Sequence, residues 1–179
     1  MNRFALGTTF ALLFASTALA GPQYVDESGF AVSGYDVVAY HALEQNALGT
    51  GQPEAVPGST EFTAEHNGAT WAFASAENRD RFLAEPDKYA PAYDGHCAYG
   101  VAKGGKVPAN PNLWRIVDGV LYLNINPAVV SFWEEDIPGY IETSEQNWTG
   151  VETEPASERS WKSIKTNDDT YTASAPIGG

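Results

Sequence analysis

The sequence contains very little sulfur. Cys97 is the only cysteine and Met1 is the only methionine. A single cysteine excludes a disulfide within the chain, and the lack of methionine after Met1 excludes the methionine-rich sites that bind soft metal ions. The side chains left for such metals are the thiol of Cys97 and three imidazoles, those of His41, His66 and His96.

Basic residues are also scarce. The chain has 10 Lys and Arg against 23 Asp and Glu, which gives a formal net charge of −13. An acidic surface repels phosphate backbones, so we expect no nucleic-acid partner. Anionic membrane surfaces are disfavoured for the same reason. The composition indicates a well-solvated acidic surface rather than a specific cationic partner.

Long apolar runs are missing after the first twenty residues, "MNRFALGTTFALLFASTALA". Arg3 provides a positive start, residues 4–15 are mostly apolar, and Ala18-Leu19-Ala20 is a small-x-small cleavage pattern. We therefore predict a signal peptide over residues 1–20 that is cleaved after its last alanine. The apolar run is too short for a membrane anchor and no charged stop follows it. The expected location is the bacterial periplasm or the medium, with no membrane insertion of the mature chain.

Two stretches have the pattern of β-hairpins. "EFTAEHNGATWAFAS" contains Asn67-Gly68, the preferred type I′ turn, and "LWRIVDGVLYLNI" turns at Asp118-Gly119. Side chains alternate along a strand, so each hairpin has one apolar face that must be buried. In the first hairpin, the expected cross-strand pairs are His66 with Ala69, Ala64 with Trp71, and Phe62 with Phe73. In the second, the apolar face carries Trp114, Ile116, Leu121 and Leu123.

Helix-start signals separate these hairpins. Ser33 and Ser75 are predicted N-caps, Pro86 begins a further short turn, and Asn126-Pro127 is an N-cap followed by proline at the first helical position. Two hairpins are marginal alone and need helices to cover them. We predict an α+β fold, an antiparallel sheet built from the two hairpins and packed by short helices, over residues 21–149. Residues 150–179 read as a polar tail.

The segments "GYDVVAYH", "NGATWAFASAENRDRFLAEPDKYAPAYDGHCAYGVAKG" and "LWRIVDGVLYLNIN" together resemble the exported bacterial YHS-domain proteins. The resemblance runs from about Gly34 to Trp148. It implies the fold more strongly than it implies an activity. Metal-handling members of the wider YHS group resemble treble-clef modules with cysteines around a strand-to-helix turn, where this chain has Ala74 and Asn78. The resemblance therefore implies that this particular metal site is missing.

A second departure from the family pattern concerns the histidines. In the exported subgroup, aromatic residues are usual where this chain has His41, His66 and His96. These residues and Cys97 form our candidate metal site, because imidazole and thiolate suit copper, which we place ahead of zinc. On this hypothesis the protein is a non-catalytic binding module, and its partner is a metal ion or a periplasmic protein.

Several alternatives stay open from the sequence. A module without a metal cofactor would bind a protein or a small ligand in an aromatic-lined cleft, and Cys97 would then be a buried core residue with an inert thiol. A thiol-dependent enzyme would need a base and an orienting partner such as Asp94 or Asp36, yet "DGHCAYG" matches no nucleophile motif. An exported lone thiol can also join two chains by a disulfide.

Overall fold

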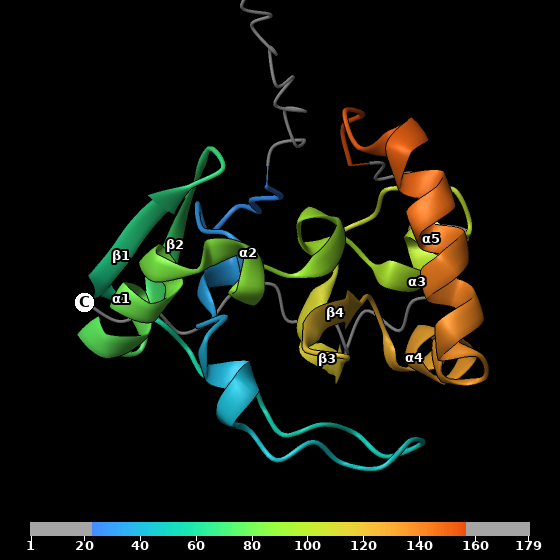
Figure 1. Cartoon of the computed structure of the whole chain (residues 1–179), viewed down its shortest axis with the longest axis horizontal. Helices are drawn as coiled ribbons and strands as arrows, with labels where there is room; N and C mark the ends of the chain where they lie inside the picture. The colour runs from blue at the N-terminus through green and yellow to red at the C-terminus, as the bar shows by residue number, and fades with distance from the viewer. Residues whose placement is uncertain (1–22, 157–179) are drawn as a thin grey trace, which may run out of the picture.

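The computed structural model describes residues 23–156, so the predicted signal peptide and residues 157–179 lie outside them. Figure 1 shows the first hairpin with α1 and α2 in one half of the molecule, and the second hairpin with α3, α4 and α5 in the other. The predicted α+β class is confirmed. In chain order the elements are β1 (Ser59–His66), β2 (Ala69–Phe73), α1 (Ala76–Ala84), α2 (Pro86–Tyr89), α3 (Ala98–Ala102), β3 (Asn110–Val117), β4 (Val120–Asn124), α4 (Pro127–Glu134) and α5 (Ile137–Val151).

Both predicted hairpin turns are present. Asn67 and Gly68 have φ values of 48° and 72°, and Asp118 and Gly119 have 49° and 83°. Two consecutive residues with positive φ define the type I′ turn, which suits the twist of the flanking strands. Within the described residues the strands pair only inside each hairpin, so the structure has two two-stranded antiparallel sheets and not one continuous sheet.

One predicted pair in the first hairpin is wrong. His66 faces Ala69 and Ala64 faces Trp71 as expected, but the register shifts between Ser59 and Thr63, and Phe73 faces Ser59. Phe62 therefore has no place opposite Phe73 and is only partly buried. A bulge of this kind inserts unpaired residues into one strand and bends it.

The second hairpin follows its predicted register. Trp114 faces Leu123 and Ile116 faces Leu121. Three of these four side chains are at most 3 % exposed, and Ile116 packs against the same core from its edge. The apolar face predicted from alternation is confirmed.

Most helix starts also follow the sequence. The Ser75 hydroxyl accepts the N–H of Asn78, and the Asn126 side chain accepts the N–H of Val129. Pro86 and Pro127 each stand in the first turn of a helix, where a missing N–H costs nothing. The last helix, α5, ends at Val151, so regular structure continues past the domain end predicted at residue 149.

The predicted N-cap at Ser33 is wrong. Ser33 lies in a tight turn with φ at 52°, and its hydroxyl donates to the Asp26 carboxylate at 2.6 Å. The carboxylate of Asp36 caps the short 3₁₀ turn Ala39–Ala42 instead, because its Oδ1 accepts the N–H groups of Val38 and Ala39. An acidic residue two or three positions before such a turn satisfies the same orphan donors.

Asp36 joins two parts of the chain that are far apart in the sequence. Its Oδ1 accepts from Val38 N at 2.9 Å and Ala39 N at 3.2 Å, and its Oδ2 accepts from Ala74 N at 2.8 Å and Asn78 Nδ2 at 2.7 Å. The residue is fully buried. The strand-to-helix turn at which the family resemblance places metal-binding cysteines is therefore filled here by hydrogen bonds to a carboxylate.

The buried apolar side chains form two clusters, of which the larger joins the two halves. The larger one lies under both hairpins and includes Trp71, Phe82 and Leu121, while the smaller one packs Tyr122 and Trp133 beneath α3 and α5. Burying aromatic side chains of this size contributes several kcal/mol in total. Among residues 23–156, no helix is both long enough and apolar enough to cross a bilayer.

Candidate functional site

The four residues predicted to bind a metal do not form one ligand set. Across residues 23–156, no three His, Cys, Asp or Glu side chains converge in a way that could hold a metal ion. Each histidine instead packs against its own aromatic neighbours: His41 against Tyr89, His66 against Trp71 and Phe82, and His96 against Tyr24 and Trp148. A closed site with three or four protein ligands therefore does not fit these residues.

Cys97 has the surroundings of a core residue. It is fully buried, and its Sγ accepts the N–H of Gly100 at 3.4 Å at the start of α3. Its thiol faces Asn124 Oδ1 at 3.5 Å. Burial raises the pKa of the thiol to about 11, although N–H donors nearby lower it in part. A thiol held in this state is protonated at neutral pH and is a poor nucleophile.

His96 is buried beside it and is held in one tautomer. Its Nδ1 lies 2.8 Å from the carbonyl oxygen of Tyr93, so Nδ1–H donates and Nε2 carries the lone pair. Burial lowers the pKa of the imidazole to about 4. Nε2 is also buried and has no hydrogen-bond partner within the described part of the chain. His96 is thus a neutral imidazole with one unused acceptor.

The other two histidines are half-buried. The His41 ring meets Tyr89 edge-on at 5.2 Å, and burial, then the nearby charge of Lys88, lowers its pKa. His66 lies at the last position of β1, beside the turn, with its ring edge-on to Phe82 at 5.5 Å. Of the four predicted residues, His66 lines a cavity of the described structure.

That cavity, which we name the hairpin cleft, lies between the tip of the first hairpin and the segment after α2. Its volume is about 270 Å³ and it is partly open to solvent. Its lining residues come from both sides of the first hairpin and from three other segments: Gln23, His66, Asn67, Trp71, Asp87, Ala90, Pro91 and Asp94.

Local backbone geometry fixes the walls of the hairpin cleft. The type I′ turn places His66 and Asn67 at one wall. Asp94, another lining residue, has positive φ like Tyr93 before it, and its carbonyl accepts from Tyr24 N at 3.0 Å and from Gln23 Nε2 at 2.7 Å. Left-handed backbone in non-glycine residues is uncommon and is kept by such surrounding contacts.

The hairpin cleft has the electrostatic character of a cation site. Its lining residues within the described structure include Asp87 and Asp94 and no Lys or Arg. Burial raises the pKa of Asp94 to about 6, and Lys106 and Glu152 act on it in opposite directions. The Asp94 carboxyl is therefore mostly ionised at pH 7 and mostly neutral at pH 5. Two carboxylates and an imidazole can together attract a small cation and accept its hydrogen bonds.

Comparison with known families locates the same region. Residues 53–93 match the YHS domain family model. All residues that line the hairpin cleft fall inside this match except Gln23 and Asp94. YHS domains as a family are associated with metal binding, which is consistent with a metal-binding module in general terms. No curated protein and no solved structure matches the chain.

Sequence reasoning missed most of this cleft. Asp87 lies in the first turn of α2, where an acidic residue is expected because it stabilises the start of a helix. Gln23 carries no signal in the sequence, and the sequence predicts Asp94 as a partner for a reactive thiol, not as a cation ligand. The one usable signal was the Asn-Gly turn, which places His66 at a hairpin tip.

Proposed function

We propose that the protein is an exported, non-catalytic binding module that holds a small cation in the hairpin cleft. The observation that carries the proposal is the lining of that cleft, which includes Asp87, Asp94 and His66 and no Lys or Arg among its described residues. Its position inside the YHS match supports the same assignment. The pattern of residues 1–20 supports export to the periplasm.

The state of Cys97 supports a binding role over thiol catalysis. Catalysis by cysteine needs a thiolate, a base within hydrogen-bond reach and access for a substrate. Cys97 is fully buried with a raised pKa, and its hydrogen-bond neighbours are an amide side chain and a backbone N–H. These features belong to a structural thiol.

Two classes of cation suit the cleft, a metal ion and an organic ammonium. His66 offers an imidazole nitrogen of the kind that copper and zinc prefer, and Asp87 and Asp94 offer oxygen ligands. Because no three such side chains converge among residues 23–156, a metal ion here would keep water ligands. An organic ammonium would need only to donate hydrogen bonds to the same oxygens.

Calorimetric titration of the mature chain, prepared without an affinity tag, distinguishes these two classes. The probes are Cu²⁺, Zn²⁺ and propylammonium. We expect His66→Phe and Asp87→Asn each to weaken binding of the preferred probe by about fivefold to tenfold, as for the loss of one partly exposed charge-assisted contact. Binding should also weaken below pH 6, because Asp94 is protonated there.

His41→Phe is the matched control, since it removes an imidazole that packs against Tyr89 outside the cleft. Its affinity should stay within twofold of wild type. The proposal fails if none of the three probes binds, or if the control variant loses as much affinity as His66→Phe.

A second candidate, copper held by Cys97 together with His96, is favoured by one observation. His96 has a buried Nε2 with no partner among the described residues, and it directly precedes Cys97 in the sequence. Elemental analysis after copper loading tests it. If this site is real, Cys97→Ala takes up one copper equivalent less than wild type. Equal uptake by both proteins excludes Cys97 as a ligand.

A further inference from the structure

A second cavity lies in the half of the molecule that the YHS match does not cover. We name it the outer groove; its volume is about 590 Å³ and it is open along one side. It is formed by the loop before β1, the outer part of β3 and the junction of α4 and α5. The lining residues are Gln45, Leu48, Arg115, Ile116, Val117, Asp118, Glu134, Glu135, Asp136, Ile137 and Pro138.

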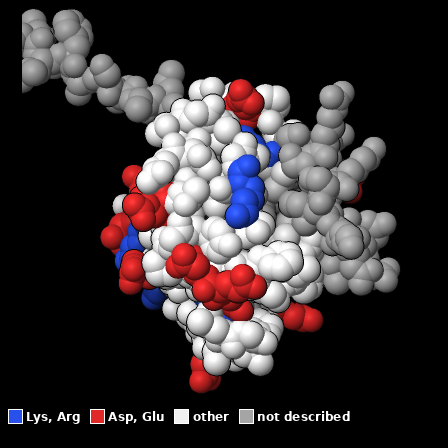
Figure 2. Space-filling view, turned by 90° about the vertical axis from the view of Figure 1, so that its right-hand side faces the viewer, with Lys and Arg blue, Asp and Glu red and all other residues white. Residues whose placement is uncertain are grey.

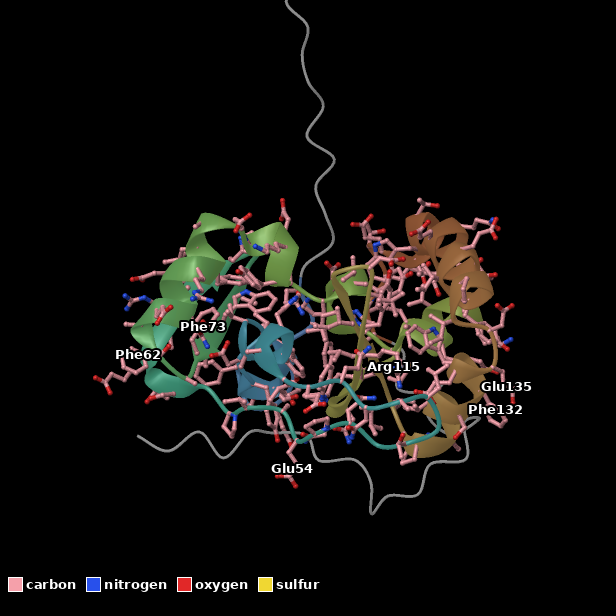
Figure 3. All side chains as sticks on the ribbon, turned by 60° about the horizontal axis from the view of Figure 1, so that its bottom comes forward. Glu54, Phe62, Phe73, Arg115, Phe132 and Glu135 are labelled. Atoms are coloured by element: carbon pink, nitrogen blue, oxygen red, sulfur yellow. The ribbon has the colours of Figure 1, made fainter. Side chains whose placement is uncertain are left out.

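The groove is held open by a buried ion pair. Arg115 Nη2 lies 2.6 Å from Glu134 Oε1, and both side chains are only 8 % exposed. Arg115 also donates to the carbonyls of Asn46 and Ala47, and Glu134 Oε2 accepts from Gly49 N at 2.7 Å. The pair therefore fixes the loop over residues 46–49 against β3 and α4. Figure 3 places Arg115 toward the middle of the molecule and Glu135 at its outer end.

The loop presents an apolar side chain that nothing in the described structure covers. Leu48 is 58 % exposed although its loop is firmly attached. Together with Ile116, Val117, Ile137 and Pro138 it gives the groove an apolar surface. A pre-formed apolar groove of this volume is within the usual range for ligand and peptide sites.

The rim of the groove is acidic. Asp118, Glu135 and Asp136 lie on it, and none of them forms an ion pair with another residue of the range 23–156. The only cation in the lining is Arg115, which is already bound to Glu134. Figure 2 shows acidic side chains gathered over the lower part of the face it presents. A ligand that complements this rim carries positive charge.

Strand addition does not explain this groove. At the outer edge of β3, the N–H of Ile116 donates to the side-chain oxygen of Gln45 at 2.7 Å. That contact occupies a backbone donor that an added strand would need. Recognition therefore depends on side chains of the occupant, both apolar and basic.

We propose that the outer groove binds a short segment of a partner protein in which lysine or arginine alternates with apolar residues. The apolar side chains of the segment pack against Leu48 and Ile137, and its cations pair with the acidic rim. This site is separate from the hairpin cleft, so either proposal can fail without the other.

The test uses fluorescence anisotropy with a labelled six-residue peptide of alternating lysine and leucine, at low salt, on the mature chain. We expect the double variant Asp118→Asn/Glu135→Gln to raise the Kd about fivefold, and Leu48→Ser to raise it by a similar factor. A peptide with glutamate in place of lysine should not bind. Thermal unfolding of each variant checks that these exposed substitutions leave the fold intact.

The matched control is Glu61→Gln/Glu142→Gln, which removes two exposed negative charges elsewhere. It should change the Kd less than twofold. The proposal is overturned if the peptide does not bind, if the control weakens binding as much as the groove variant, or if Leu48→Ser has no effect. It is also overturned if hexylammonium competes at the affinity of the peptide, since the groove would then be a site for small amines.

Discussion

Replacing Asp36 with alanine is expected to lower the free energy of unfolding by about 3–5 kcal/mol, the cost of breaking a buried charged network. The carboxylate is fully buried and accepts four hydrogen bonds. Alanine would leave Val38 N, Ala74 N and Asn78 Nδ2 without this acceptor, whereas Ala39 N also donates to the carbonyl of Asp36. Urea unfolding followed by tryptophan fluorescence measures the change.

Asp36→Asn keeps the shape and changes the hydrogen bonding. One side-chain oxygen can still accept two N–H groups, but the new amide NH₂ would face the donors that Oδ2 now satisfies. We expect it to be destabilised almost as much as the alanine variant. Asp80→Asn, an exposed carboxylate on α1, is the control and should change stability by less than about 1 kcal/mol. A loss below about 1 kcal/mol in Asp36→Ala would contradict the role assigned to this network.

The sequence predicted local features well because their causes are local. A type I′ turn needs two adjacent residues that tolerate positive φ, and Asn67-Gly68 and Asp118-Gly119 are such pairs. The N-caps at Ser75 and Asn126 likewise depend on one side chain and a donor three residues away.

The predictions failed where a distant segment intervenes. Phe62 does not face Phe73 because the segment before β1 is held by a different part of the chain. Pro57 forms a β-bridge with Tyr35, and Gly58 N donates to the carbonyl of Gly34. A Cβ on Gly58 would lie 2.5 Å from the backbone of Ala72, so this approach needs glycine. The capping role moved from Ser33 to Asp36 for a related reason, since Asp36 is also held by the start of α1.

The candidate site shows the same limit. The sequence predicts His66 at a hairpin tip. Its neighbours in the cleft include Gln23, Asp87 and Asp94, which are distant in the sequence. Their convergence depends on how α2 and the following turn pack onto the hairpin. Cys97 is the only cysteine of the chain, yet its burial follows from packing that no spacing motif reveals.

His96 should make the protein sensitive to acid. Burial first, together with the charge of Lys106, lowers its pKa from 6.5 to about 4, although the bond to Tyr93 acts the other way. Between pH 6.5 and pH 4, His96 binds a proton in the unfolded chain but not in the folded protein. The free energy of unfolding therefore falls as the pH falls through this range. Below pH 4 both states are protonated and the loss is complete. The expected contribution is about 2–3 kcal/mol.

Asp94 opposes this effect in wild type, so the test must separate the two groups. Its raised pKa of about 6 means that the folded state holds a proton more tightly than the unfolded chain, and its contribution to stability is lost as the pH rises from 4 to 6. His96→Phe removes only the imidazole. Relative to wild type, we expect this variant to gain about 2–3 kcal/mol between pH 7 and pH 4, measured by urea unfolding across that range. Asp94→Asn should deviate in the opposite direction. Stability curves of wild type and His96→Phe that run parallel from pH 7 to pH 4 would mean that the imidazole titrates normally and is open to solvent in the folded protein.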